Sequence, residues 1–64
     1  MTLFIVYSDR NDEWHSECYF TTYNGAYDAY KYLKVLYDCQ YYIVQTEANW
    51  VTPNGKIVFE DFES

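Results

Sequence analysis

The chain has few basic side chains: four lysines and arginines stand against ten aspartates and glutamates among 64 residues. Nucleic-acid binding depends on lysine and arginine side chains that neutralise phosphates, so this balance argues against direct binding of nucleic acid. The formal net charge of −6 instead favours a partner with a basic surface. We therefore expect a basic protein as the partner.

Cysteine, glycine and proline are also scarce. Two cysteines, Cys18 and Cys39, are too few for a disulfide scaffold, so we expect reduced thiols, with a single bridge as the alternative. One proline and two glycines argue against a disordered or linker-like chain. No apolar run approaches the roughly 20 residues that span a membrane, and Met1–Tyr7 lacks the basic start of a signal peptide. We expect one intracellular domain over residues 1–64, without membrane association.

Aromatic side chains are abundant, at 23% of the residues, and nine of them are tyrosines. A chain of this length buries only about 60% of its unfolded surface, so a stable core needs large side chains. Aromatic rings bury on the order of 150–250 Å² each. Tyrosine also suits an interface, because its ring packs while its hydroxyl stays solvated.

A β-hairpin is predicted in the first third of the chain. Leu3–Tyr7 is a continuous apolar run, which is typical of a central strand. Residues 13–20 alternate, with even-numbered side chains on one face and odd-numbered side chains on the other. Asp9–Asp12 between them is predicted as the turn, because Asp and Asn tolerate unusual backbone angles.

A helix is predicted after the hairpin, with Thr21, Thr22 and Asn24 as candidate caps. Its apolar residues recur at the helical period from Ala26 onward. The predicted core side consists of Ala26, Ala29, Tyr30, Leu33, Leu36 and Tyr37. The predicted solvent side consists of Tyr27, Lys31, Lys34 and Asp38.

Two more strands are predicted, at 41–50 and 56–62, joined by a turn at 52–55 in which Asn54-Gly55 supplies positive φ. The order β-β-α-β-β defines an α+β fold. The first and third strands carry the apolar runs of central strands, and the second and fourth carry the charges of edges. We therefore predict a four-stranded antiparallel sheet of order 2-1-3-4 with the helix on one face.

One helix covers only one face of such a sheet, so an aromatic surface is left on the other. With Trp14, Phe20, Tyr42 and Val44 assigned to the helix, the outward side chains would be Tyr19, Tyr41 and Ile43, beside Glu13, His15 and Glu17. A large exposed aromatic patch usually marks an interface.

The strand directions also predict that acidic residues gather at one end of the sheet. We call this the acidic end; it comprises Asp9, Asp12, Glu13, Asp38, Glu60, Asp61 and Glu63. Lys31 and Lys34 are expected to neutralise the helix, and no Lys or Arg is expected to compensate the acidic end. The alternative is that these acids are the ordinary solvated charges of turns and termini.

Catalytic and metal sites find little support. His15 and Cys18 lie on opposite faces of one strand, so they cannot converge on zinc or form a nucleophilic pair. Glu13 and Glu17 are roughly 13 Å apart, which is too far for a glycosidase pair. We expect no enzyme activity, no metal and no cofactor.

In size, acidity and β-β-α-β-β order the chain is similar to small inhibitor proteins of phages and other mobile elements, including anti-CRISPR and anti-restriction proteins. Several of these block a nuclease by imitating the charge of DNA. The resemblance implies a non-enzymatic inhibitor or adaptor, acting in the cytoplasm of a bacterial host on the basic groove of a nucleic-acid-binding complex. The neutral helix departs from the all-over acidity of extreme DNA mimics.

The residues expected to bind the partner are acidic or aromatic. They are Asp9, Asp12, Glu13, Glu17, Tyr19, Asp38, Tyr41, Glu60, Asp61 and Glu63. The alternative function is a structural module that forms a homodimer through its aromatic sheet face.

Overall fold

The computed structural model describes residues 1–47 and 54–61. The ends of the third and fourth predicted strands, the first half of the predicted turn between them and Glu63 lie outside these residues. The elements are β1 (Thr2–Arg10), β2 (Glu13–Phe20), α1 (Tyr23–Leu36), β3 (Gln40–Glu47) and β4 (Asn54–Asp61). The predicted order β-β-α-β-β is confirmed.

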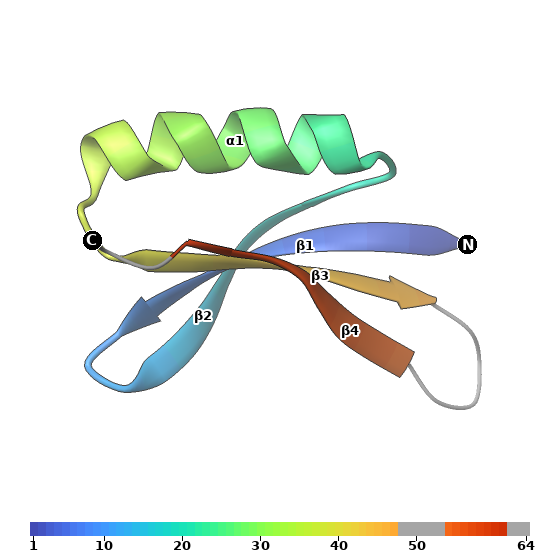
Figure 1. Ribbon diagram of the computed structural model, residues 1–64, viewed down its shortest axis with the longest axis horizontal. Helices are drawn as coiled ribbons and strands as arrows, with labels where there is room; N and C mark the ends of the chain where they lie inside the picture. Colours follow the sequence, from blue (N-terminus) through green and yellow to red (C-terminus); the bar gives the residue numbers. More distant parts are fainter. Residues whose placement is uncertain (48–53, 62–64) are drawn as a thin grey trace.

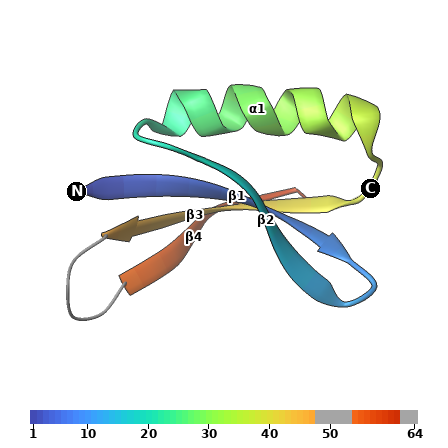
Figure 2. The same cartoon turned by 180° about the vertical axis from the view of Figure 1, so that it is seen from behind.

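The four strands form one antiparallel sheet of order β2-β1-β3-β4, as predicted. Figure 1 and Figure 2 show α1 lying along one face of this sheet, with the other face uncovered by any helix. The apolar strands β1 and β3 are central, and the more charged β2 and β4 form the edges. Among the described residues, no helix is long and apolar enough to cross a membrane.

The β1–β2 turn is shorter than predicted, because Asp9 and Arg10 belong to β1 and pair with β2. Asn11 and Asp12 adopt positive φ angles of 56° and 63°. A two-residue hairpin turn with both φ values positive matches the right-handed twist of the strands, and Asn and Asp accept it more readily than most residues.

Gly55 does not have the conformation predicted for it. It lies in β4 opposite Thr46, and neither glycine has a positive φ. A Cβ at this position would lie 3.0 Å from Cγ1 of Val44. Close approach between β3 and β4, rather than turn geometry, therefore explains this glycine.

Helix α1 is capped by one of the three residues predicted for that role. Thr22 is the N-cap, and its Oγ1 accepts a hydrogen bond from the backbone N–H of Gly25 at 3.1 Å. At the other end the N–H of Tyr37 donates to the carbonyl of Leu33 at 2.7 Å. Both ends thus satisfy backbone groups that a helix leaves without partners.

The predicted core side of the helix is correct at Tyr30 and Leu33 but wrong at three other residues. Tyr27, assigned to solvent, packs against the core beside Tyr30 and Leu33. Leu36 and Tyr37, assigned to the core, are exposed. The prediction was wrong because tyrosines lie on several sides of this helix, so apolar spacing alone does not select one stripe.

The core lies between α1 and the central strands. Val6, Ala26 and Ile43 are fully buried, and Tyr41 is 1% exposed. The Tyr41 hydroxyl donates toward the carbonyls of Leu33 at 3.1 Å and Tyr37 at 2.8 Å. The expectation that Tyr41 and Ile43 face outward is therefore wrong: the phenol satisfies carbonyls at the end of the helix, which requires it to face α1.

A β-bulge in β2 overturns a second face assignment. The β1–β2 register shifts between Val6, opposite Cys18, and Tyr7, opposite Ser16, which leaves Glu17 as an extra residue. One extra residue moves every side chain beyond it to the other face. Trp14 therefore lies on the face away from the helix, whereas Glu13, His15 and Glu17 lie on the helix side.

Candidate protein-binding surface

The sheet face away from α1 is the candidate site, and we call it the outer face. The alternation of β1 and β3, with Val6 and Ile43 toward the helix, assigns its residues through the strand register. Its principal side chains are Leu3, Ile5, Tyr7, Asp9, Trp14, Tyr19, Tyr42, Val44, Ile57 and Glu60.

Three aromatic rings from three strands form a cluster on the outer face, which we call the aromatic stack. The rings of Trp14 and Tyr42 are parallel to within 17°, with centroids 4.2 Å apart. Tyr7 lies 5.6 Å from Trp14 at an angle of 44°. Tyr42 is only 9% exposed, whereas Trp14 is 45% exposed. Trp14 therefore covers Tyr42 and presents aromatic surface to solvent.

A row of apolar side chains crosses the outer face beside the aromatic stack. Tyr19 is opposite Ile5, Ile5 is opposite Val44, and Val44 is opposite Ile57. Both ends of the row are open to solvent, since Tyr19 is 70% and Ile57 44% exposed. A shallow groove runs along the β1–β2 part of the row, and Leu3 and Ser16 contribute to its lining.

Two carboxylates lie next to the aromatic stack. Asp9 is the register partner of Trp14, and Glu60 is the register partner of Tyr42. Side chains opposite each other in antiparallel strands have Cβ atoms about 4.5–5.5 Å apart. Burial, and then the negative charges of Asp9 and Glu60, raise the pKa of the Tyr42 phenol. The negative charges of both acids therefore act on the aromatic stack.

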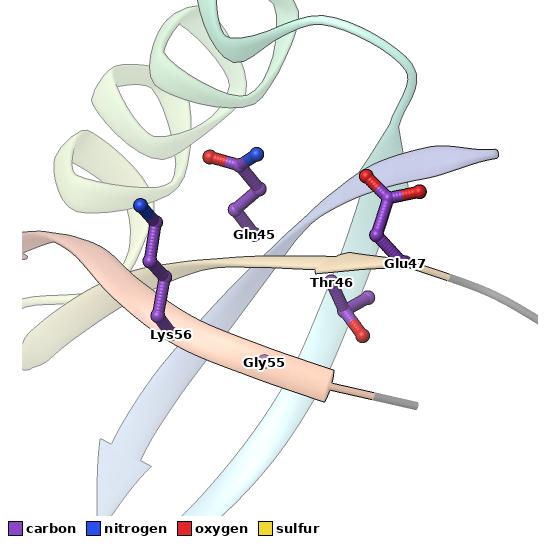
Figure 3. A pocket seen from close by; sticks show the side chains of 5 residues that line it. All are labelled: Gln45, Thr46, Glu47, Gly55 and Lys56. Atoms are coloured by element: carbon purple, nitrogen blue, oxygen red, sulfur yellow. The ribbon is translucent and has the colours of Figure 1, made fainter. Parts of the chain in front are cut away.

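The chain's four basic side chains lie elsewhere. Arg10 contacts Glu17 at 3.2 Å on the helix side of the sheet, and Lys31 contacts Asp28 at 3.7 Å along the helix. Figure 3 shows Lys56 and Gln45 extending toward the helix side, opposite to Thr46. In the described part of the chain, therefore, the outer face carries carboxylates and no lysine or arginine.

Lys34 joins the helix to the end of β4. Its Nζ lies 3.1 Å from a carboxylate oxygen of Asp61 and 3.5 Å from one of Asp38, and it donates to the carbonyl of Cys39 at 2.9 Å. Burial alone would lower the pKa of Lys34, but the hydrogen bonds and charges of Asp61 and Asp38 outweigh it and raise that pKa.

These contacts correct the expectation that no cation compensates the acidic end. Lys34 neutralises Asp61 and Asp38, and Arg10 neutralises Glu17, which also accepts from Ser8 at 2.5 Å. In the described part of the chain, no lysine or arginine lies within ion-pair distance of the remaining acids. These are Asp9, Asp12, Glu13 and Glu60. Glu13 lies 3.7 Å from His15 on the helix side.

The expected partner-binding residues therefore divide among several places. Asp9, Tyr19 and Glu60 lie together on the outer face. Asp12 is in the hairpin turn and Glu13 follows it, while Glu17, Asp38 and Asp61 contact cations on the helix side. Tyr41 is in the core, and Glu63 lies outside the described residues.

A second shallow hollow lies where β3 ends and β4 begins. It is lined by Gln45, Thr46, Glu47, Gly55 and Lys56 (Figure 3). Glu47 accepts a hydrogen bond from Thr2 and lies 3.6 Å from the N-terminal amine. No group of three metal-ligating side chains converges here or elsewhere in residues 1–47 and 54–61. Cys18 and Cys39 are free thiols.

Comparison of the chain with protein-family models, curated proteins and solved structures finds no match. The surface has to be interpreted from its own geometry.

Sequence reasoning did not place Tyr7, Trp14, Tyr42 or Ile57 on the outer face. It recognised the alternation in β3, but aromatic and branched side chains occupy both of its faces. The bulge at Glu17 has no marker such as a glycine in the sequence. The signal that could have located the outer face is the register of β1 and β3 in which Val6 and Ile43 lie side by side. Both are then buried on the helix side, and their neighbours in each strand face outward.

Proposed function

We propose that this protein is a non-enzymatic inhibitor or adaptor that docks its outer face on a basic surface of a partner protein. The observation that supports this most strongly is that, among the described residues, the outer face carries carboxylates without any lysine or arginine. Asp9 and Glu60 lie beside exposed aromatic and aliphatic side chains, while Arg10, Lys34 and Lys56 are on the helix side. Complementary charge steers association, and apolar surface at the centre supplies affinity.

The partner surface would be a groove that otherwise holds nucleic acid, in the bacterial cytoplasm, as in anti-CRISPR or anti-restriction inhibition. Such a groove is basic because it neutralises phosphates. The two outer-face carboxylates would take the place of phosphates, and Trp14 and Tyr19 would pack against the walls of the groove. Asp38, Asp61 and Glu17 are neutralised by Lys34 and Arg10, so they would not imitate phosphates. The proposal is therefore a localised inhibitory face rather than a full imitation of duplex DNA.

The test begins with immobilised protein and a nuclease-treated bacterial lysate, from which bound proteins are eluted by increasing salt. We expect a basic partner whose binding to nucleic acid is then inhibited by the free protein. The variant Asp9→Asn/Glu60→Gln should elute at lower salt. The control Asp28→Asn/Glu47→Gln removes the same number of charges from the helix and the helix side of the sheet. The proposal fails if both variants elute alike, or if the captured partner still binds nucleic acid normally.

Self-association is the second candidate, because the apolar row of Tyr19, Ile5, Val44 and Ile57 crosses all four strands. Sedimentation velocity over increasing protein concentration distinguishes the two. A monomer agrees with docking on a different protein. A dimer that Ile57→Lys dissociates would favour the structural module instead.

A further inference from the structure

The Trp14 indole of the aromatic stack is only partly covered by the other two rings. Tyr42 lies against one side of the Trp14 indole at 4.2 Å, yet Trp14 remains 45% exposed. A large part of the indole is therefore open to solvent. An indole face attracts cations, because the ring quadrupole places negative charge above it, and Trp is the strongest of the aromatic residues in this respect.

The register partners of the two stacked rings are both carboxylates. Asp9 is opposite Trp14 and Glu60 is opposite Tyr42. Tyr42 is only 9% exposed, so its ring forms the floor beneath Trp14. Trp14 and Tyr42 together with the two acids thus combine a flat π surface, a phenol oxygen and carboxylates that can accept from several N–H groups.

We infer that the Trp14–Tyr42 stack with Asp9 and Glu60 is a seat for an arginine side chain of the partner. The inference rests on the proposed function and names the chemistry recognised at its centre. A guanidinium is planar, so it stacks on an indole while its edge donates to carboxylates in a fork geometry. A lysine ammonium is a compact, strongly hydrated point charge that gains less from a flat ring. The seat therefore prefers arginine to lysine.

The experiment uses intrinsic fluorescence of the full chain with Trp50→Phe, so that Trp14 is the remaining tryptophan. The probes are three blocked tripeptides, acetyl-Gly-X-Gly-amide, in which X is arginine, lysine or citrulline. Citrulline has the shape of arginine without the charge. We expect saturable quenching of Trp14 by the arginine peptide in the millimolar range, and about threefold to tenfold weaker binding of the lysine peptide. The citrulline peptide should not saturate.

Charge variants show whether the carboxylates take part. In the Trp50→Phe background, Asp9→Asn/Glu60→Gln should weaken arginine binding about threefold or more, because both charged acceptors are lost. The matched variant Asp28→Asn/Glu47→Gln should leave it unchanged. Amide resonances of Ile5, Tyr19 and Val44 show that the outer face stays folded.

The outcomes separate this inference from the proposed function. Equal binding of arginine and citrulline, or of arginine and lysine, would overturn the arginine seat, even if the partner complex still depends on Asp9 and Glu60. Arginine binding that survives Asp9→Asn/Glu60→Gln would overturn it as well. If the seat behaves as expected but the partner complex ignores these substitutions, the proposed function fails and the seat stands.

Discussion

Both faces of the sheet carry aromatic and branched aliphatic side chains, but α1 covers only one of them. On the covered face, Val6 and Ile43 are fully buried and the Tyr41 hydroxyl donates to carbonyls of the helix end. On the outer face, Trp14 and Ile57 remain nearly half exposed. The covered face is closed by the chain itself, whereas the outer face has the composition of a core without a layer over it.

The faces also differ in how their charges are used. On the covered face, Asp61 and Glu17 contact Lys34 and Arg10, so carboxylates there serve mainly to hold elements together. On the outer face, Asp9 and Glu60 have no such cation in the described part of the chain. Asp61 and Glu17 on the covered face thus stabilise the fold, whereas Asp9 and Glu60 on the outer face remain available for a partner.

The largest expected difference between the faces is in stability. Ile43→Ala should lower the free energy of unfolding by about 3–5 kcal/mol, because it leaves a cavity in a site with no exposure. Ile57→Ala should cost less than about 1 kcal/mol, because that side chain is already 44% exposed. Urea unfolding followed by circular dichroism measures both. If Ile43→Ala does not fold, Ile43→Val against Ile57→Val gives the same comparison at about 1 kcal/mol.

Equal losses for the two isoleucines would show that the outer face is as closed as the core. That result would remove the main argument for an interface there.

Removing a tyrosine hydroxyl should give an intermediate difference in stability between the two faces. Tyr41→Phe should cost about 1–2 kcal/mol, because it removes hydrogen bonds to the Leu33 and Tyr37 carbonyls. Tyr19→Phe, on the outer face, should change stability by less than about 0.5 kcal/mol. The measurement is urea unfolding at pH 7.

The stability of Tyr41→Phe and Tyr19→Phe should also depend differently on pH above about 10. Burial, followed by the hydrogen bond and charge of Cys39, raises the pKa of Tyr41 well above its usual value near 10. A raised folded-state pKa contributes stability that is complete below about pH 10 and is lost as pH rises toward the folded-state pKa. The free energy of unfolding should therefore fall less steeply with rising pH in Tyr41→Phe than in the parent chain. In Tyr19→Phe it should fall as steeply as in the parent chain. Parallel pH profiles for Tyr41→Phe and the parent chain would contradict this account.

The smallest expected difference concerns the cations. Lys34→Gln should cost about 1 kcal/mol, because Lys34 is half-buried and bonds to Asp61 and the Cys39 carbonyl. Lys31→Gln, which removes the exposed pair with Asp28, should cost about 0.3 kcal/mol. Thermal unfolding at low and moderate salt checks both. A loss for Lys31→Gln as large as that for Lys34→Gln would mean that Lys34 does not tie α1 to β4.

Much of the fold could be predicted from the sequence. The apolar run at Leu3–Tyr7, the alternation in residues 13–20 and the helical period after Ala26 identified the elements. The contrast between apolar and charged strands then gave the sheet order, because edge strands carry charge that central strands cannot. Three residues of the candidate surface, Asp9, Tyr19 and Glu60, were also among those expected to bind a partner.

The predictions of which side chains share a face, and of which acids are neutralised, failed for particular physical reasons. The side of β3 that meets the helix is decided by the hydrogen bonds of Tyr41 to the helix end, and Tyr42 beside it is chemically identical. The position of Trp14 depends on the bulge at Glu17, which follows from how β2 pairs with β1. The neutralisation of Asp61 by Lys34 joins residues 27 positions apart in the sequence.

The sequence by itself determined the net charge, the order of the elements and the order of the strands, because these depend on composition and on local periodicity. Only the tertiary structure decided which side chains make the core and which make the outer face. A period of two is the same whichever face is buried, and a single extra residue reverses it. Long-range packing made that choice, and it left the aromatic stack uncovered beside Asp9 and Glu60.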